Sequence, residues 1–362
     1  MRAIRTNAIR SRLSTVLNIL LASLAGLSAL AGLMAGHVLA ADEPRPPLAI
    51  QFSLDRPIDA TDAPFVMAST GGLFSAEGLA VTFNIASGSP DAIARVAAGT
   101  SDFALVDINA LVRFRDKDKQ GVPPIKAVFV LFNRAPYAII ARKSRGIQAL
   151  SDMEGKNLGV AEGDLSIRLW PAVAKQNGIK LAGVKQSSIS AAVREPMLSA
   201  GQIDAVTGFS YLSAINLKDR GVPADDLAVL QFADYGCEAY GFAIFVNPAL
   251  AAAKPDAVKG FVRAVIGGVH LTVKDQVDTV NEVVNRMDGG SRDLELERLH
   301  AILHDNILTT EVKRNGLGGI DAGRFERSID QLAEGFKFQK RPAPADIFDD
   351  QFLPPVNGRL IN

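Results

Sequence analysis

The sequence predicts an α/β protein of two lobes with a similar plan, followed by a helical C-terminal segment. The first observation is the stretch from Ser87 to Asp107, in which a polar loop, an amphipathic helix and a short apolar strand follow one another. A second helix-to-strand corner, at Gly201, repeats this arrangement 102 residues after Gly99. From Pro248 onward the pattern is almost wholly helical. Strand-and-helix units followed by helices are typical of a sheet with a helical cover.

The unit at the first corner has clear boundaries. Ser89 is a good N-cap residue, Pro90 suits the first helical position, and Gly99 favours the left-handed conformation just after the helix. Phe103 to Val106 is an apolar run of the kind that a buried strand needs, and Asp107 follows it. Backbone N–H groups at a helix start and a carboxylate at a strand end are positions where open α/β sheets hold ligands.

The other elements follow from the same patterns of apolar periodicity and turn residues. Strands are predicted at 48–54, 79–86, 126–132, 137–142, 158–161, 203–207, 228–232 and 240–246. Helices are predicted at 65–74, 110–114, 166–177, 190–200, 255–273, 276–287, 293–304 and 324–336. Gly71 and Gly72 weaken the end of the first of these helices, and Pro171 stands either near the first turn or at a kink of the third.

The helix-to-strand corners of the two lobes carry matching residues. Gly99 and Asp102 in the first correspond to Gly201 and Asp204 in the second, both with an offset of 102 residues. Two matches on the same kind of corner indicate two lobes of similar plan. They favour a structural role for Asp102 over contact with a ligand.

The first forty residues have the features of an export signal. Four arginines precede a long apolar run, and Val38-Leu39-Ala40 fits a cleavage site before Ala41. The length of the run leaves an uncleaved membrane anchor as the alternative. The absence of a cysteine near the cleavage site argues against a lipid anchor. We expect cleavage after Ala40 and a periplasmic protein.

Removal of the signal gives the mature chain a formal charge of −4, because the signal holds four of the 39 Lys and Arg and none of the 39 Asp and Glu. A negative charge argues against nucleic acid as a partner. Cys237 is the single cysteine and cannot form an intramolecular disulfide, so stability must come from the core. The 322 residues that follow Ala40 in the 362-residue chain suffice for two α/β lobes.

The sequence carries no recognisable catalytic motif. A phosphate-binding loop, a dinucleotide-binding glycine pattern and a nucleophile elbow are all absent. His300 and His304 have the spacing of metal ligands, but no glutamate follows His300 and no third ligand is evident, which favours a polar helix face. Cys237 has no basic neighbour in sequence to activate it. We therefore expect a protein that is not an enzyme and has neither a metal nor another cofactor.

Polar and aromatic residues gather instead on loops after predicted strands, and such loops converge at one edge of an open α/β sheet. Each of them alone has an ordinary explanation as a turn, cap or core residue. Because both lobes present them, we expect a ligand-binding cleft lined by Asp62, Phe65, Ser87, Gly88, Ser89, Asp107, Asn133, Glu162, Asp164, Ser166, Phe209, Tyr235 and Tyr240.

Four segments carry a family resemblance: DAPFVMASTGGLFSAEGLAV from Asp62, GSPD with AAGTSDFALVD between Gly88 and Asp107, LSDMEGKNLGV from Leu150, and ADYGCEAYG from Ala233. They resemble the substrate-binding proteins of ABC importers. More narrowly, they are similar to the branch grouped with thiamine-pyrimidine-synthesis proteins and with nitrate, sulfonate and taurine binders. The likeness covers most of residues 48–273.

The resemblance implies a two-lobed type II periplasmic-binding-protein fold with two crossing hinge strands and a helical C-terminal cover. The expected parts are a signal at 1–40, a spacer at 41–47, lobe 1 at 48–142, lobe 2 at 143–238, the return strand and C-terminal helices of lobe 1 at 239–340, and a tail at 341–362. Such a protein, expected as a monomer, captures a small molecule between its lobes and delivers it to an ABC permease in the inner membrane. The ligand favours the closed form through its contacts with both lobes.

The ligand is inferred from the residues on the loops. Acidic residues are frequent there, beside aromatic ones: Asp62, Asp107, Glu162, Asp164, Asp234 and Glu238. Carboxylates accept N–H bonds and aromatic rings stack, which favours a thiamine-precursor-like aminopyrimidine or a similar small heterocycle.

Two alternatives to this ligand remain open. The first is a small anion such as a sulfonate, taurine or nitrate, because Ser87 to Ser89 offers an anion-binding helix start and Arg134 or Arg168 can pair with an anion. The second is an enzyme, because the related pyrimidine synthases show that this fold can support catalysis. Their cysteine-rich signature is absent from a chain with one cysteine.

Overall fold

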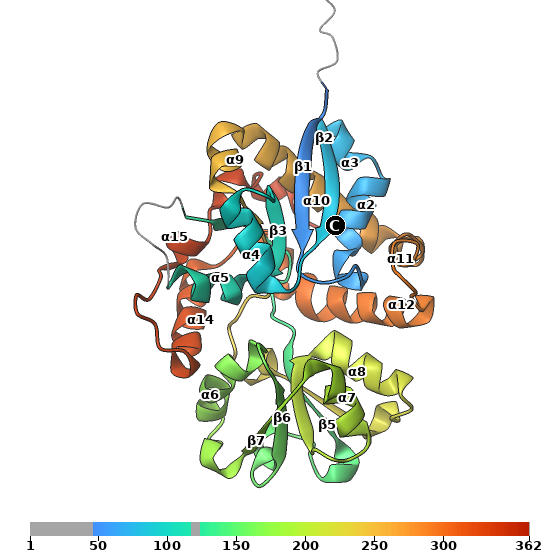
Figure 1. Ribbon diagram of the computed structural model, residues 1–362, viewed down its shortest axis with the longest axis vertical. Helices are drawn as coiled ribbons and strands as arrows, with labels where there is room; N and C mark the ends of the chain where they lie inside the picture. Colours follow the sequence, from blue (N-terminus) through green and yellow to red (C-terminus); the bar gives the residue numbers. More distant parts are fainter. Residues whose placement is uncertain (1–45, 117–123, 362) are drawn as a thin grey trace, which may run out of the picture. The chain divides into compact units, whose positions relative to one another are not determined.

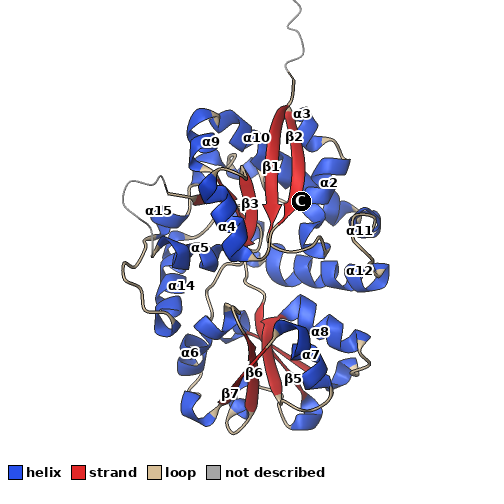
Figure 2. Ribbon diagram, in the orientation of Figure 1, coloured by secondary structure: helices blue, strands red, loops and turns tan. Residues whose placement is uncertain are grey.

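The computed structural model describes residues 46–116 and 124–361. The predicted signal and residues 41–45 of the predicted spacer lie outside the described residues. Two five-stranded mixed sheets with helices packed on them organise the described chain (Figures 1 and 2). We use lobe 1 for the part built on the first sheet and lobe 2 for the part built on the second. The predicted α/β class is confirmed. Within the described ranges, no helix is both long and apolar enough to cross a membrane.

The sheet of lobe 1 has the strand order β2-β1-β3-β10-β4. Its strands are β1 (Leu48–Leu54), β2 (Leu79–Ile85), β3 (Phe103–Asp107), β4 (Lys126–Val130) and β10 (Phe242–Val246). β1 is parallel to β2 and β3, whereas β10 is antiparallel to β3 and β4. All residues of β3 and β10 are buried, as expected for strands covered on both faces.

The sheet of lobe 2 has the order β7-β6-β8-β5-β9. Its strands are β5 (Tyr137–Arg142), β6 (Asn157–Ala161), β7 (Lys185–Ile189), β8 (Ala205–Phe209) and β9 (Leu227–Gln231). β6 is parallel to β7 and β8, and β5 is antiparallel to β8 and β9. Position for position, this pattern equals that of the first sheet, so the two lobes have the similar plan that the sequence predicts.

The matching corners have matching hydrogen bonds. The glycine that ends each preceding helix has a left-handed φ, of 75° and 71° respectively. Asp102 Oδ2 accepts a hydrogen bond from Gln51 N at 2.7 Å, and Asp204 Oδ2 accepts one from Asn157 N at 2.8 Å. Each aspartate thus ties its own strand to the neighbouring strand, which confirms the structural role predicted for Asp102.

Two segments connect the lobes along the chain. We call 131–136, between β4 and β5, the first crossing segment, and 236–241, ahead of β10, the second crossing segment. Each ends in a strand of the lobe that it enters, since β5 pairs within the second sheet and β10 within the first. Residues 137–142, which we expected in lobe 1, therefore pair in the sheet of lobe 2.

Helices cover both sheets. Lobe 1 carries α2 (Ala63–Thr70), α3 (Leu73–Ala76), α4 (Ser89–Ala98), α5 (Ile108–Arg115), α9 (Pro248–Ala253), α10 (Pro255–Lys274), α11 (Gln276–Val284), α12 (Arg292–Ala301), α13 (Thr310–Asn315) and α15 (Pro344–Ile347). Lobe 2 carries α6 (Ser166–Gln176), α7 (Arg194–Ser199) and α8 (Ser210–Asp219).

Several helix boundaries differ from the prediction. The predicted helix 65–74 is split into α2 and α3, because Gly72 has a φ of 68°. α4 has Gly88 as its N-cap instead of Ser89, and the Ser89 hydroxyl donates to Asp55 Oδ2 at 2.7 Å. The predicted helix 190–200 is a 3₁₀ turn followed by the short α7, and α12 continues into a π-helical turn, Ile302–Ile307.

Helix α14 (Ala322–Gly335) joins the two lobes. Its buried side chains Phe325, Ile329 and Leu332 share one hydrophobic cluster with Trp170 of α6. The packing is so close that a Cβ at Gly335 would lie 2.1 Å from Arg168 O. α14 was expected in lobe 1, and it packs firmly on lobe 2.

Candidate functional site

A cavity of about 250 Å³ receives residues from both lobes. Lobe 1 contributes Arg56, Ser89 and Asp107, and lobe 2 contributes Ala161, Glu162, Gly163, Asp164, Leu165, Ala191, Arg194, Gly208, Phe209 and Leu212. The lobe 1 residues follow β1, begin α4 and end β3, and most of the lobe 2 residues lie where β6 and β8 lead into helices. These are the carboxyl ends of parallel strands, where open α/β sheets bind ligands. We call this cavity the cleft.

Arg56 lies over aromatic rings at the wall of the cleft. Its Cζ is 5.2 Å from the centroid of the Phe209 ring and 4.6 Å from that of Phe242. Its Nε donates to Asp55 Oδ1 at 2.9 Å. Burial lowers the pKa of Arg56, but the charge of Asp55 and the hydrogen bond to it outweigh burial and raise the pKa overall. The guanidinium is therefore a permanent cation that Asp55 balances.

Asp107 caps α5 from the end of β3. Its Oδ1 accepts from Asn109 N at 2.8 Å and from Asn109 Nδ2 at 2.9 Å, and its Oδ2 accepts from the hydroxyl of Tyr137. Burial raises the pKa of Asp107 to about 6, although the Tyr137 and Asn109 hydrogen bonds oppose the shift. A carboxyl group with this pKa changes between hydrogen-bond donor and acceptor near neutral pH.

Asp164 organises the wall of the cleft in lobe 2. Its Oδ1 accepts from Ser166 N at 2.9 Å and from Ser166 Oγ at 2.5 Å, and its Oδ2 accepts from Thr207 Oγ1 at 2.7 Å. Both partners are fully buried. Asp164 thus joins the start of α6 to β8, and its carboxylate is fixed in the cleft before any ligand arrives.

Arg194 is the second arginine of the cleft. Its Nε donates to Glu195 Oε1 at 3.0 Å, and its Nη1 lies 4.0 Å from Asp164 Oδ2. Ser213 Oγ also donates to Glu195 Oε1, at 2.8 Å. The absence of a side chain at Gly208 makes room here, since a Cβ there would lie 3.4 Å from Arg194 Cζ and 2.5 Å from Ser213 Oγ.

The structure brings five of the predicted residues together at the cleft: Ser89, Asp107, Glu162, Asp164 and Phe209. Ser166 lies beside it as a partner of Asp164. Ser87 and Gly88 form the turn before α4 without lining the cavity, and Ser87 N donates to Asp91 Oδ2 at 2.9 Å.

The other predicted residues lie elsewhere. Phe65 packs in the core against Phe52, with ring centroids 5.0 Å apart. Asp62 is buried in the capping turn with Asp59, and burial, followed by the charge of Asp59, raises its pKa well above the usual range.

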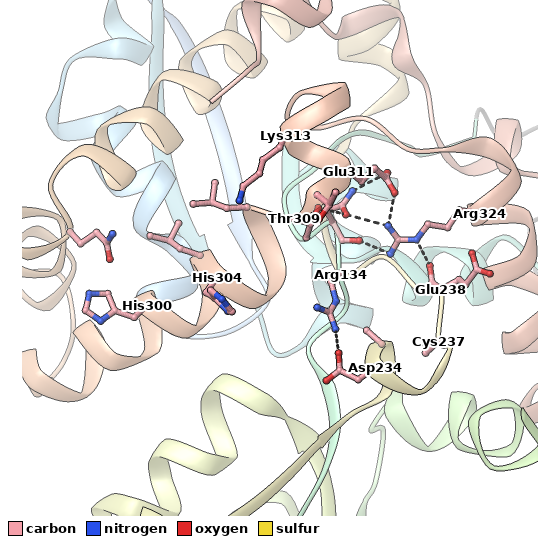
Figure 3. Close-up of a pocket in the computed structure, with 16 residues that line it drawn as sticks. Arg134, Asp234, Cys237, Glu238, His300, His304, Thr309, Glu311, Lys313 and Arg324 are labelled. Carbon is pink, nitrogen blue, oxygen red and sulfur yellow. Dashed lines mark hydrogen bonds and ion pairs between the residues drawn. The ribbon is translucent and has the colours of Figure 1, made fainter. Parts of the chain in front are cut away.

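Two of the remaining predicted residues, Asn133 and Tyr240, lie at or next to a second cavity, of about 810 Å³ (Figure 3). Asn133 and Arg134 line it, and Arg134 pairs with Asp234 at 2.6 Å. Tyr240 lies next to it and donates to Glu311 Oε1 at 2.8 Å. Tyr235 lines neither cavity and packs, partly buried, against the hydrophobic cluster that contains Trp170.

Sequence reasoning missed both arginines of the cleft. Arg134 and Arg168 were the expected cations, but Arg134 lines the second cavity and Arg168 is exposed on α6. Arg56 could have been found, since it directly follows β1 and its Asp55 neighbour. No local sequence pattern marks Arg194, because its guanidinium reaches the cleft by packing against Gly208, which is distant in the sequence.

The described residues hold no group of three or more His, Cys, Asp and Glu side chains placed to bind a metal ion. His304 Nδ1 instead lies 2.7 Å from Asp305 Oδ1. Cys237 is buried, and burial raises the pKa of its thiol to about 11. A thiol with that pKa is a poor nucleophile at neutral pH.

Three similar proteins set the context. The chain is 26% identical over 310 residues to a riboflavin-binding protein of Chloroflexus aurantiacus, covering 81% of this chain and 82% of that protein. It is 26% identical over 211 residues to a 4-amino-5-hydroxymethyl-2-methylpyrimidine phosphate synthase of Legionella pneumophila, covering 58% of this chain and 65% of that protein, so less than two thirds of the synthase is matched. The periplasmic aliphatic sulphonate binding protein of Escherichia coli superposes with a TM-score of 0.65 at 13% identity, over 87% of this chain and 92% of that one.

The superposition shows that the fold is the two-lobed fold of periplasmic binding proteins. The NMT1/THI5-like family model matches residues 60–279. This range takes in strands β2 to β10, the two crossing segments and every residue that lines the cleft except Arg56. Because the match covers more than half of the chain, the protein belongs to the NMT1/THI5-like family.

Proposed function

We propose that this protein is the extracytoplasmic solute-binding component of an ABC importer, and that it holds a small, planar, nitrogen-bearing heterocycle in the cleft. The observation that carries the proposal is the lining of the cleft, where an aromatic ring and three carboxyl groups from both lobes surround one small cavity. A ligand that contacts both lobes favours the arrangement that encloses it, and a permease in the inner membrane can recognise that arrangement.

The side chains suit the edge and the face of such a ring. Phe209 and the planar guanidinium of Arg56 offer flat surfaces for stacking. Glu162 and Asp164 accept N–H bonds, and Asp107 can accept or donate because its pKa is about 6. The volume of about 250 Å³ suits a single small ring system. Riboflavin and the aminopyrimidine named in the two relatives are both nitrogen heterocycles, which supports this ligand class.

A small anion is the second candidate, and Arg56 and Arg194 are the observation in its favour. The two arginines belong to different lobes, and both line the cleft. Each is already paired with the carboxylate next to it in sequence, Asp55 at 2.9 Å and Glu195 at 3.0 Å. With Glu162 and Asp164 added, the cleft has no excess positive charge. The balance therefore favours the heterocycle.

Ligand binding by the mature protein tests the proposal. Thermal unfolding and titration calorimetry with aminopyrimidines, riboflavin, sulfonates and nitrate should show a concentration-dependent increase in Tm for a heterocycle and none for the anions. Glu162→Gln and Phe209→Leu should each weaken binding about tenfold, because the first replaces a charged carboxylate acceptor with a neutral amide and the second removes a stacking face. Asp225→Asn, an exposed acid of lobe 2 outside the cleft, is the control and should bind as the wild type does.

If sulfonates raise the Tm and heterocycles do not, the ligand is a small anion and the proposal of a heterocycle is wrong. Chemical conversion of a bound heterocycle would instead indicate an enzyme related to the synthases. We further propose that the protein is exported to the periplasm, cleaved after Ala40 and monomeric, and the mass of the secreted protein together with light scattering checks this.

A further inference from the structure

One guanidinium holds both connections between the lobes. Arg324, near the start of α14, donates from Nη2 to Asn133 O of the first crossing segment at 2.8 Å. It also donates to the second crossing segment, from Nε to Glu238 O at 3.0 Å and from Nη2 to Ala239 O at 3.3 Å. Figure 3 shows the Arg324 guanidinium beside Glu238. The planar fork of an arginine lets a single side chain bridge two backbone segments in this way.

A carboxylate completes the same connection. Glu311 of α13 accepts from Arg324 Nη1 at 2.8 Å through Oε2. Its Oε1 accepts from Tyr240 Oη at 2.8 Å and from Asn133 Nδ2 at 3.0 Å, so Glu311 also contacts both crossing segments. Arg324 Cζ lies 4.0 Å from the centroid of the Tyr240 ring. We call Arg324, Glu311, Asn133 and Tyr240 the crossing clamp.

The two charged residues of the clamp are anchored in different lobes. Arg324 belongs to α14, which packs along α6 of lobe 2 so closely that a Cβ at Gly335 would lie 2.1 Å from Arg168 O. Glu311 is followed in α13 by Val312, which is buried in the cluster of the lobe 1 helices. A rotation of one lobe against the other moves these anchors relative to each other. The Arg324–Glu311 pair therefore resists such a rotation directly.

The clamp is also connected to the cleft. Asn109 Nδ2 donates to Tyr240 O at 2.7 Å and to Asp107 Oδ1 at 2.9 Å. Tyr137, the residue after the first crossing segment, donates to the other oxygen of Asp107. A ligand at Asp107 and the clamp at Arg324 thus act on the same two connections.

The crossing segments also pair with each other through backbone hydrogen bonds, from Ala135 N to Ala239 O at 3.1 Å and from Gly241 N to Phe132 O at 2.9 Å. The second cavity, of about 810 Å³, borders them there and is lined by Asn133, Arg134, Cys237 and Glu238 among others. Arg324 adds a side-chain link to this backbone pairing and connects it to Glu311 of α13.

We propose that Arg324 is a positioning residue, which holds the two crossing segments together and thereby fixes the arrangement of the lobes that forms the cleft. The proposal rests on the proposed function only for its effect on ligand affinity. Without the clamp, the ligand-free protein samples a wider range of lobe arrangements, and a ligand must select the binding arrangement from a smaller fraction of the population.

Distances between the lobes test this without any ligand. Dyes on Lys254→Cys in lobe 1 and Lys185→Cys in lobe 2 report the distance distribution by single-molecule energy transfer, and the native Cys237 is buried. We expect Arg324→Gln to broaden the distribution and to weaken binding of a heterocycle about tenfold. Glu311→Gln retains the backbone contacts of Arg324 and should broaden the distance distribution less. This variant provides the test if Arg324→Gln does not fold.

The control is Arg263→Gln, which removes a two-fold contact with Glu77 at 2.8 and 2.6 Å inside lobe 1. It should leave the distances between the lobes and the affinity unchanged. A lower Tm for Arg324→Gln with an unchanged distance distribution would overturn the proposal and leave Arg324 a purely structural residue. If no heterocycle binds the wild type, the proposed function fails, whereas the ligand-free distributions still decide the role of Arg324.

Discussion

Asp107 combines two roles at one carboxyl group. As the N-cap of α5 it accepts hydrogen bonds from Asn109, and through Tyr137 and Tyr240 its network reaches both connections between the lobes. It also lines the cleft. Burial of this carboxyl group raises its pKa to about 6. The group is therefore sensitive to pH near neutrality.

Asp107 should make the stability of the protein depend on pH. Because the folded pKa is about 6 and the ordinary value is 3.8, the folded state binds more protons than the unfolded chain between these values. This contribution is fully present below the lower pKa and is lost as the pH rises through the higher one. The unfolding free energy of the wild type relative to Asp107→Asn should fall by about 2 kcal/mol from about pH 4 to about pH 7.

Urea unfolding of both proteins across this pH range measures the difference. Val277→Ala, at an exposed position and without a change of ionisable group, is the control and should show a difference that is constant with pH. A constant difference for Asp107→Asn as well would show that the carboxyl group titrates normally in the folded protein.

At the scale of elements, close packing between α2 and α10 builds the helical layer of lobe 1. A Cβ at Gly268 of α10 would lie 2.0 Å from Pro64 O and 3.0 Å from Ala68 Cβ of α2. Backbone cannot move aside as a flexible side chain can. The absence of a side chain at Gly268 thus sets the distance between the two helices.

Gly268→Ala should destabilise the protein by about 2 kcal/mol or more, because it forces the two helices apart. Gly323→Ala in α14 is the matched control, since the nearest atom to its new Cβ lies 3.4 Å away. The control should be neutral or stabilising by up to about 1 kcal/mol, from the helix propensity of alanine. Chemical denaturation of both variants measures the two effects, and equal effects would show that α2 and α10 can separate at little cost.

At the scale of the whole molecule, hydrophobic clusters extend across both lobes. One contains Trp170 of α6 and Phe325 of α14 together with buried residues of α4 and α5. The other joins the lobe 1 helices to Tyr211 of α8. Because the lobes share these clusters, unfolding of one lobe exposes buried side chains of the other. The described chain should therefore unfold as one cooperative unit.

The single tryptophan provides the probe for this expectation. Trp170 is fully buried in lobe 2, whereas circular dichroism reports helices of both lobes. The two signals should follow the same denaturation curve. Leu332→Ala, at a fully buried position of α14, should shift both curves together by about 2–5 kcal/mol. A tryptophan transition that precedes the loss of helix would mean that lobe 2 unfolds alone.

Much of the fold could be predicted from the sequence because the signals are local. The strands at 48–54 and 137–142 have the predicted bounds, and α4 and α10 agree with the prediction within one residue. β7 was not predicted, because Lys185–Ile189 reads KQSSI and this exposed edge strand lacks an apolar run. α8 was not predicted either, since both its faces contain buried residues and no amphipathic period marks it.

The sequence by itself determined the α/β class, the two lobes of similar plan and the matching corners at Asp102 and Asp204. These depend on caps, turns and periodicities that involve residues close together in the chain. Only the tertiary structure decided which side chains meet in the cleft, and it placed Asn133 and Tyr240 with Arg324 instead. Asn133 and Arg324 are 191 residues apart, so their contact depends on how α14 docks onto lobe 2. Docking follows from the shapes of whole packed surfaces, and no local pattern encodes those shapes.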